Sequence, residues 1–344
     1  MRQRTKKISI IAIMANLFIT TAAFAQAFYS DNKVDQVQTS SISPNAGVQN
    51  QKLINNAQNV NQTKKSKEQI ASHQIIMARA GVSSGVIDGA VGSNYKNAIA
   101  AFEKMTGRVI DPKNDKALLI SLNASGGPAF TQYTITQEDV SQFYVAEIPS
   151  DYAKKAALPR LAYTSTREML AERFHIDENY LQEINPGVDF NRHGVTIKVP
   201  NLLLPKRKKV YFVIADKKLK QVFGYGEDGS LVVVYPSTIG SSDNPSPTGT
   251  LEVKRIAINP NYTYNPKINF KQGENDSILT LPPGPNGPVG TVWIALSKPT
   301  YGIHGTPEPS KIGKTSSHGC VRLTNWDATE LAHLVSPGVI VHFQ

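Results

Sequence analysis

Residues 316–323 of this chain, Ser-Ser-His-Gly-Cys-Val-Arg-Leu, contain its single cysteine, Cys320. A second cluster, Tyr-Gly-Ile-His-Gly-Thr at residues 301–306, precedes it and contains His304. A cysteine without a second cysteine in the chain forms no internal disulfide, so it is either a buried inert thiol or a reactive one. The glycine directly before Cys320 and the two nearby histidines favour a reactive thiol.

A nucleophilic Cys320 needs a base, because a thiol with the ordinary pKa of about 8.5 is mostly protonated at neutral pH. His318 lies two residues before the cysteine, a separation of about 6 to 7 Å along an extended strand, which is awkward for direct proton transfer. We therefore expect His304, delivered from another strand, to be the general base. His318 is then expected to shape the site.

Acyl transfer chemistry also needs hydrogen-bond donors for the oxyanion of a tetrahedral intermediate. The backbone amides of His318, Gly319 and Cys320 are candidates, because glycine permits a sharp approach of the backbone. Arg322 lies on the same side of an extended chain as the cysteine. It could bind a carboxylate through two hydrogen bonds, or form an ordinary salt bridge within the domain.

Zinc binding is the competing use of one cysteine and two histidines. The spacing leaves a fourth ligand to be found elsewhere, so we expect no metal. The remaining histidines lie apart from both clusters: His73, His175, His193, His333 and His342. No cofactor is expected.

The first 25 residues have the pattern of a secretory signal peptide. Four basic residues within residues 1–7 precede an apolar stretch over residues 8–24, which ends at the small-x-small pattern Ala23-Phe24-Ala25. A membrane anchor is the alternative, but the stretch is short for a span and polar residues interrupt it. We expect an exported protein of the periplasm or cell wall, without a stable membrane span after cleavage.

The charge of the chain points to an anionic polymer as its partner. Cleavage after residue 25 removes four positive charges and lowers the formal net charge from +10 to +6. A basic exported protein suits a polymer such as the cell wall, whereas export and the lack of interleaved basic and aromatic residues argue against nucleic acid.

The N-terminal region has two expected parts. Residues 26–67 are rich in Gln, Asn and Ser and predict a disordered linker. Residues 68–123 predict two amphipathic helices, at 69–80 and 94–106, joined by a turn-rich link containing Asp88-Gly89. This arrangement resembles the peptidoglycan-binding-like helical domain, although an ordinary helical hairpin could share it.

Residues 161–201 predict a second small module. Ser165 and Glu168 form the pattern of a capping box, a second helix ends at Asn185-Pro186-Gly187, and a strand follows at 195–199. The series resembles a LysM module, a fold that binds N-acetylglucosamine chains. Thr164-Ser165 replaces the usual Gly-Asp before the first helix.

The region after residue 205 predicts a mainly β domain, sandwich-like or barrel-like. One helix is expected at 325–334, and residues 259–288 predict a loop without a clear strand that could cover a groove. Strands are expected at 210–214, 219–225, 231–235, 250–256, 292–296 and 339–343.

The two clusters together, followed by Asn325, resemble the L,D-transpeptidase catalytic domain of the YkuD type. The likeness covers about residues 208–344, and Thr238-Ile239-Gly240, residues 245–250 and residues 281–285 support it in the expected order. It implies a β-sandwich-like domain preceded by small wall-binding modules. It also implies that Tyr301, Ser317, Arg322 and Asn325 contact substrate.

The resemblance implies a reaction in which Cys320 attacks the third residue of a peptidoglycan tetrapeptide stem and releases D-alanine. The resulting thioester passes to an amine, forming a 3→3 cross-link or attaching a protein such as an outer-membrane lipoprotein. With water as acceptor the enzyme would be a carboxypeptidase or endopeptidase, and a non-catalytic wall-binding protein is the alternative from another class. Gly305 stands where some members carry serine, so a third group beside His304 would be a backbone carbonyl.

Overall fold

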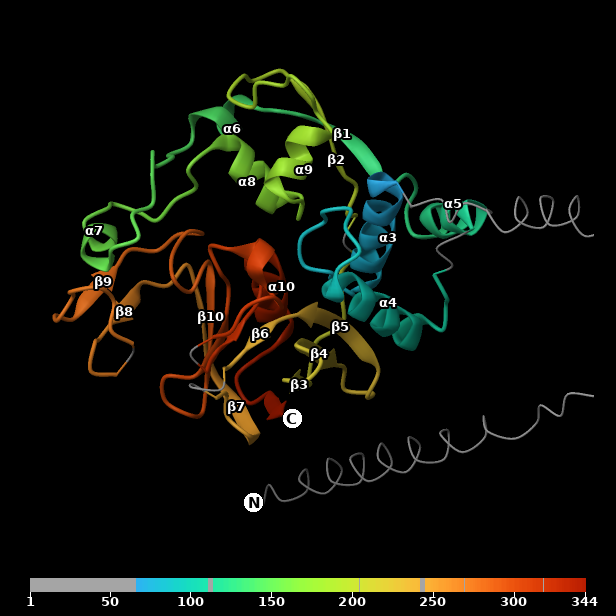
Figure 1. Ribbon diagram of the computed structural model, residues 1–344. Coiled ribbons are helices and arrows are strands. Elements are labelled where there is room, and N and C mark those ends of the chain that lie inside the picture. The colour runs from blue at the N-terminus through green and yellow to red at the C-terminus, as the bar shows by residue number, and fades with distance from the viewer. Residues whose placement is uncertain (1–65, 111–113, 204, 242–244, 269, 318) are drawn as a thin grey trace, which may run out of the picture. The chain divides into compact units, whose positions relative to one another are not determined.

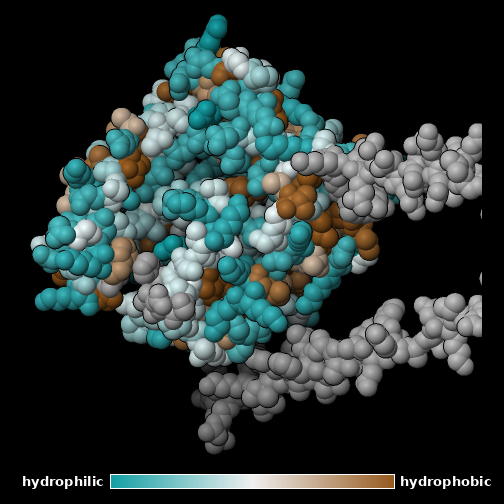
Figure 2. All heavy atoms as spheres, viewed as in Figure 1, coloured by the Kyte–Doolittle hydropathy of each residue, from teal (hydrophilic) through white to brown (hydrophobic). Residues whose placement is uncertain are grey.

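The computed structural model describes residues 66–110, 114–203, 205–241, 245–268, 270–317 and 319–344. The expected signal peptide, nearly all of the expected linker, and His318 lie outside the described residues. No helix within these ranges is long and apolar enough to cross a membrane. The face in Figure 2 is mainly hydrophilic, with hydrophobic residues in separate patches, as is common on folded proteins.

The C-terminal region folds into a nine-stranded sheet with the order β5-β4-β3-β13-β7-β10-β11-β12-β6. β5 ends at Pro236 and β6 begins at Thr238, so the chain passes from one edge strand to the other almost directly. The sheet therefore curls until its edges nearly meet (Figure 1). Its strands are β3 (Phe212–Asp216), β4 (Gln221–Tyr225), β5 (Leu231–Pro236), β6 (Thr238–Ile239), β7 (Gly249–Ile258), β10 (Val292–Leu296), β11 (Gly302–His304), β12 (Val321–Arg322) and β13 (Ile340–Phe343).

One helix, α10 (Asn325–Leu334), packs its apolar face into this sheet. Thr324 caps it by accepting a hydrogen bond from the Asp327 amide at 3.1 Å. Ala328 and Leu331, one turn apart, are fully buried in the same core as Ile294 of β10. The mainly β domain, its six expected strands to within two residues at either end, and this helix are confirmed.

The expected loop at 259–288 contains a hairpin that the sequence did not reveal. β8 (Tyr262–Tyr264) pairs antiparallel with β9 (Leu279–Leu281). The expectation of no strand there is wrong, because three-residue strands are too short to produce an alternating pattern. A single-turn helix, η1 (Pro309–Lys311), lies between β11 and β12 in the chain.

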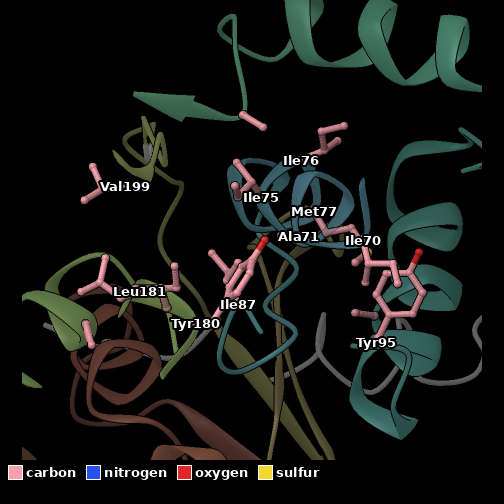
Figure 3. Close-up of a cluster of buried hydrophobic side chains, with 14 of the residues drawn as sticks. Ile70, Ala71, Ile75, Ile76, Met77, Ile87, Tyr95, Tyr180, Leu181 and Val199 are labelled. Atoms are coloured by element: carbon pink, nitrogen blue, oxygen red, sulfur yellow. The ribbon is translucent and has the colours of Figure 1, made fainter. Parts of the chain in front are cut away.

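The N-terminal helices α3 (Lys67–Ala80) and α4 (Ser93–Thr106) occur where they were expected. A third helix, α5 (Asp115–Ala124), follows them. The apolar residues of α3 lie in one cluster with Tyr95 of α4, Tyr180 of α9 (Glu178–Glu183) and Val199 of β2 (Thr196–Pro200) (Figure 3). The same cluster includes Val234 of the nine-stranded sheet, so these parts share one hydrophobic core.

The small module contains more than the expected residues 161–201. Its strand β2 (Thr196–Pro200) pairs antiparallel with β1 (Phe130–Thr134), which precedes that range. Between the two strands lie α6 (Gln137–Ser141), α7 (Tyr152–Ala156), α8 (Thr166–Arg173) and α9 (Glu178–Glu183).

The predicted capping box of α8 forms only in part. The hydroxyl of Ser165 accepts from the Glu168 amide at 3.1 Å. The Glu168 carboxylate accepts instead from the Thr164 amide at 2.6 Å, so the reciprocal bond to Ser165 is replaced by one a residue earlier.

Residues 145–162, which we call the strap, join the small module to the β8–β9 hairpin. The ring of Tyr152 contacts the rings of Tyr262 and Tyr264 edge-on, with centroids 6.2 and 5.2 Å apart. Leu161 is fully buried with Tyr264 and Leu281 in a separate apolar cluster. The strap and the hairpin therefore stabilise each other.

Candidate active site

Strand pairing places three of the predicted catalytic and binding residues on one face of the sheet. β11 and β12 are parallel neighbours, with Ile303 opposite Val321 and His304 opposite Arg322. Ile303 and Val321 are buried in the core, and successive side chains on a strand point to opposite faces. His304 and Arg322 therefore share the other face, and Cys320, two residues before Arg322, lies on that face too. The base candidate comes from a neighbouring strand, as expected.

The loop that carries Cys320 has a backbone that requires glycine. Gly319 has φ +101°, and a Cβ built on it would lie 2.9 Å from the Tyr301 ring. Tyr301 thus packs against the glycine before the cysteine, and the ammonium of Lys298 lies 4.3 Å from the centroid of its ring.

Ser317 fastens this loop to β6. Its amide donates to the Gly240 carbonyl at 3.0 Å, and its hydroxyl accepts from the Gly240 amide at 2.7 Å. The same hydroxyl donates to the Cys320 carbonyl at 2.6 Å. In this arrangement the buried Ser317 side chain positions the cysteine loop rather than facing an open surface.

His304 is buried and held in one tautomer. Its Nδ1 lies 2.7 Å from the Gly305 carbonyl, which can only accept, so Nδ1 carries the proton and Nε2 keeps a free lone pair. The acceptor is a backbone carbonyl, as the sequence predicted. The ring stacks on Trp293 of β10, with centroids 5.4 Å apart.

The electrostatic environment keeps His304 neutral. Burial, reinforced by the positive charge of Arg322, lowers its pKa to about 3, against a smaller raising effect of the Gly305 carbonyl. A neutral imidazole at physiological pH can accept a proton, which is what a general base requires.

Cys320 is a half-buried thiol that also favours its neutral form. Its Sγ donates to the Thr300 carbonyl at 3.6 Å. Burial raises the pKa of the thiol, and the Gly302 backbone and Arg322 counteract this only in part. Both shifts thus favour the neutral forms, a protonated thiol for Cys320 and an uncharged imidazole for His304.

The carbonyl that meets the thiol belongs to a residue with an unusual backbone. Thr300 has φ +70°, in the left-handed region that β-branched residues rarely adopt. Such strain costs about 1–3 kcal/mol and persists only where the surrounding structure imposes it.

Arg322 is half-buried and has no hydrogen bond or ion pair within the described part of the chain. Arg79, by contrast, is buried with its guanidinium bound to backbone carbonyls that include those of Asn201 and Pro128, at 2.8 and 2.7 Å. A shielded guanidinium normally has partners, and none of the described residues supplies one for Arg322.

Two tyrosines that sequence reasoning missed approach the site from the hairpin and the strap. The charge states of Cys320 and Arg322 both influence the pKa of Tyr262, and Arg322 influences that of Tyr152. Burial is the main reason that both phenols have raised pKa values, and it raises that of Tyr152 to about 12. Both residues lie on elements whose contacts are distant in sequence, so no local pattern marked them.

Asn325 lies behind the site, fully buried at the start of α10. Its Oδ1 accepts from the amides of Thr306 and Thr291 at 3.1 and 3.3 Å. Its Nδ2 donates to the Glu172 carboxylate and to the Pro285 carbonyl. Both the donor and the acceptor end of the Asn325 amide are therefore in use within the described chain.

Metal ligands do not gather here: across the described ranges no group of three or more His, Cys, Asp or Glu side chains could hold a metal ion.

Comparison with known proteins matches the same region. Residues 210–342 match the family model of the YkuD L,D-transpeptidase catalytic domain. The chain is 31% identical over 178 residues to the putative L,D-transpeptidase YkuD of Bacillus licheniformis, covering 51% of this chain and 92% of that protein. It is 30% identical over 186 residues to the probable L,D-transpeptidase YbiS of Escherichia coli, covering 52% of this chain and 60% of that protein.

Among solved structures, an L,D-transpeptidase from Mycobacterium smegmatis matches with 19% identity and a TM-score of 0.33, over 44% of this chain and 63% of that one. A likeness of this size does not bear on the assignment, which depends on the family model and the sequence relatives. On those two matches, the chain belongs to the family of proteins with a YkuD-type L,D-transpeptidase catalytic domain.

Proposed function

We propose that this protein is a cysteine-dependent L,D-transpeptidase of peptidoglycan, exported to the periplasm or cell wall. Cys320 attacks the carbonyl carbon of the third residue of a tetrapeptide stem. The bond to the terminal D-alanine breaks, D-alanine leaves as the free amine, and a thioester remains on the cysteine. An amine then attacks the thioester, forming a new amide and restoring the thiol.

The observation that carries this proposal is the shared face of β11 and β12. It brings to one side of the sheet a thiol, a neutral imidazole with a free Nε2 lone pair, and a guanidinium that no described residue binds. A nucleophile, a base and a carboxylate-binding cation suit acyl transfer from a donor peptide near its carboxy terminus to an amine.

Because both partners rest in the neutral form, His304 acts as a true general base. It takes the thiol proton as the sulfur attacks and gives it to the leaving D-alanine nitrogen. In the second half it takes a proton from the attacking amine and returns one to the sulfur. The Gly305 carbonyl stabilises the imidazolium that forms in each half.

The remaining site residues bind and stabilise. The amides of Gly319 and Cys320 are the proposed oxyanion donors, together with that of His318, which lies outside the described residues. Arg322 binds a carboxylate of the stem. Tyr262 and Tyr152 contact the bound stem from the side of the hairpin and the strap. Tyr301 holds Gly319 in place, and Ser317 holds the loop.

One incubation tests the reaction. The protein without residues 1–25 is mixed with disaccharide tetrapeptide, and mass spectrometry follows a thioester adduct on Cys320, loss of D-alanine and formation of dimers. Wild type is expected to give all three, and Cys320→Ala none. Identical behaviour of the two proteins would overturn the proposal.

The acceptor is determined in the same experiment. Dimers indicate a 3→3 cross-link, and a lysine-ended peptide that imitates an outer-membrane lipoprotein, added as competing amine, tests protein attachment. Tripeptide without dimers or adducts would identify water as the acceptor and make the enzyme a carboxypeptidase.

A further inference from the structure

The side chain of Asn325 connects the loop that follows His304, which we call the histidine loop, to the small module between β1 and β2. On one side its Oδ1 accepts from the Thr306 amide at 3.1 Å. On the other side its Nδ2 lies 3.0 Å from both carboxylate oxygens of Glu172, a residue of α8. Helix α8 lies beside the start of α10 (Figure 1).

The peptide group between Gly305 and Thr306 makes this connection relevant to catalysis. Its carbonyl accepts from His304 Nδ1 at 2.7 Å, and its N–H donates to Asn325. Because a peptide group is planar, fixing the direction of the N–H also fixes the direction of the carbonyl. A continuous path of hydrogen bonds therefore runs from His304 through one peptide group and one side-chain amide to Glu172.

Glu172 is one of four groups that fix the orientation of the Asn325 amide. The other end of that amide meets two backbone N–H groups, of Thr306 and Thr291, which need an acceptor. The carboxylate and the Pro285 carbonyl need donors. Only one orientation satisfies both sets, and a rotated amide would leave two buried N–H groups facing an NH₂ group.

Packing leaves the loop no room to compensate. A Cβ built on Gly305 would lie 2.3 Å from Asn325 Oδ1, and one built on Gly290 would lie 1.9 Å from the same atom. Both loops therefore contact the amide at backbone distance. A shift of the amide would displace the Gly305 carbonyl and with it the histidine.

We propose that Glu172, a residue of the small module, is a positioning residue for His304. It acts through Asn325 and the Gly305–Thr306 peptide group. The inference deepens the proposed acyl transfer at Cys320 and rests on it. It makes the small module part of the catalytic architecture, in addition to any role in binding the wall.

Orientation is what Glu172 supplies. The carboxyl is also bound by the Tyr163 hydroxyl at 3.2 Å, and burial raises its pKa to about 8, against the lowering effect of Asn325. A largely neutral acid at pH 7 still offers an acceptor to Asn325. Glutamine, which keeps a carbonyl oxygen in the same place, is therefore expected to replace it.

The test compares variants of the whole protein after thermal unfolding shows that each is folded. Glu172→Met removes the acceptor with an unbranched side chain of similar length. We expect the acylation rate constant at saturating tetrapeptide to fall about tenfold with little change in KM, since small misplacements of a catalytic group act on the chemical step. Glu172→Gln is expected to stay within about twofold of wild type.

Glu168→Gln and Glu168→Met are the matched controls. Glu168 lies one turn earlier on α8 and accepts from Asn286 Nδ2 at 2.7 Å, so it also joins the module to the catalytic region, but it does not contact Asn325. These variants should change stability and leave the acylation rate within about twofold. A loss equal to that of Glu172→Met would mean that the interface as a whole, not Glu172, is responsible.

A second readout does not depend on activity. The Thr306 amide, which donates to Asn325, should exchange with deuterium faster in Glu172→Met than in wild type and remain protected in Glu172→Gln. Unchanged exchange and unchanged acylation in Glu172→Met would overturn the proposal.

If Glu172→Met does not fold, Glu172→Asp, which withdraws the acceptor by one methylene, takes its place with the same expected outcome. If wild type forms no thioester, the proposed function fails, and amide exchange alone still decides whether Glu172 positions the loop.

Discussion

The two sides of the histidine loop differ in how one polar side chain on each is paired: Arg322 lies on the Cys320 side and Asn325 on the other. Arg322 has no hydrogen bond or ion pair within the described residues. The Asn325 amide uses both its donor and its acceptor ends. The difference separates the surface that receives a ligand from the scaffold that holds it, although both residues belong to one sequence motif.

The largest expected effect comes from removing the base on the open side. His304→Ala should lower the acylation rate by about 10²- to 10⁴-fold, because it removes the group proposed to take the thiol proton. Single-turnover mass spectrometry of the thioester measures this. The exposed His193→Ala serves as the control, and a loss below about threefold would assign the base elsewhere.

A methyl group on the closed side should damage the fold as well as the reaction. Gly305→Ala places a Cβ 2.3 Å from Asn325 Oδ1, an overlap that should cost about 1–3 kcal/mol in the free energy of unfolding. Gly92→Ala, where nothing lies within 4 Å, is the matched control. Denaturant unfolding of both variants measures the difference in the free energy of unfolding. Equal stabilities would show that the residues around Asn325 shift to accommodate the added methyl group.

Arg322→Gln removes a guanidinium that makes no hydrogen bond or ion pair with the described residues, so stability should change little. Binding of a stem carboxylate should suffer, lowering kcat/KM by about 10- to 100-fold. Steady-state kinetics with tetrapeptide measures it beside the exposed Arg192→Gln. A large loss of stability with normal kinetics would mean that Arg322 stabilises the fold and does not bind substrate.

Relief of the backbone strain at Thr300, whose carbonyl accepts from the thiol, should change the free energy of unfolding only slightly. Thr300→Asn puts a residue that tolerates the left-handed region at φ +70° and should stabilise the fold by up to about 1 kcal/mol. Thr248→Asn, at an exposed position with ordinary φ, is the control. Thermal unfolding that shows no gain, or a loss, for the first variant would mean that the strain is compensated locally.

The smallest expected effect is that of pH. An ordinary histidine loses its function as a base when pH falls through about 6.5, but burial lowers the pKa of His304 to about 3. The base therefore stays neutral, and acylation should change less than about twofold between pH 5 and pH 7. A rate–pH profile that falls with an apparent pKa near 6.5 would show that water reaches the imidazole.

The sequence predicted what local patterns encode. Alternating β-branched residues marked the long strands, and the expectation that His304 comes from another strand agrees with its place beside the cysteine strand. The two-residue strands β6 and β12 and the hairpin at 262–281 were too short to show periodicity.

The partners of the motif residues could not be predicted in the same way. Asn325 was expected to contact substrate because it follows the motif, yet its partner Glu172 lies 153 residues earlier in the chain. Ser317 was expected to contact substrate as well, and the structure places its hydroxyl between Gly240 and the Cys320 carbonyl. A motif gives spacing along the chain, whereas such contacts depend on how distant elements pack.

The raised pKa of Cys320 has a consequence for the lifetime of the enzyme. Oxidation to sulfenic acid and disulfide exchange both begin from the thiolate, so a thiol kept protonated by burial reacts slowly with oxidants. In the oxidising compartment to which we propose that the protein is exported, a permanently ionised cysteine would be oxidised over time. A proposed nucleophile that loses its proton only when substrate is bound beside the base would be oxidised slowly between reaction cycles.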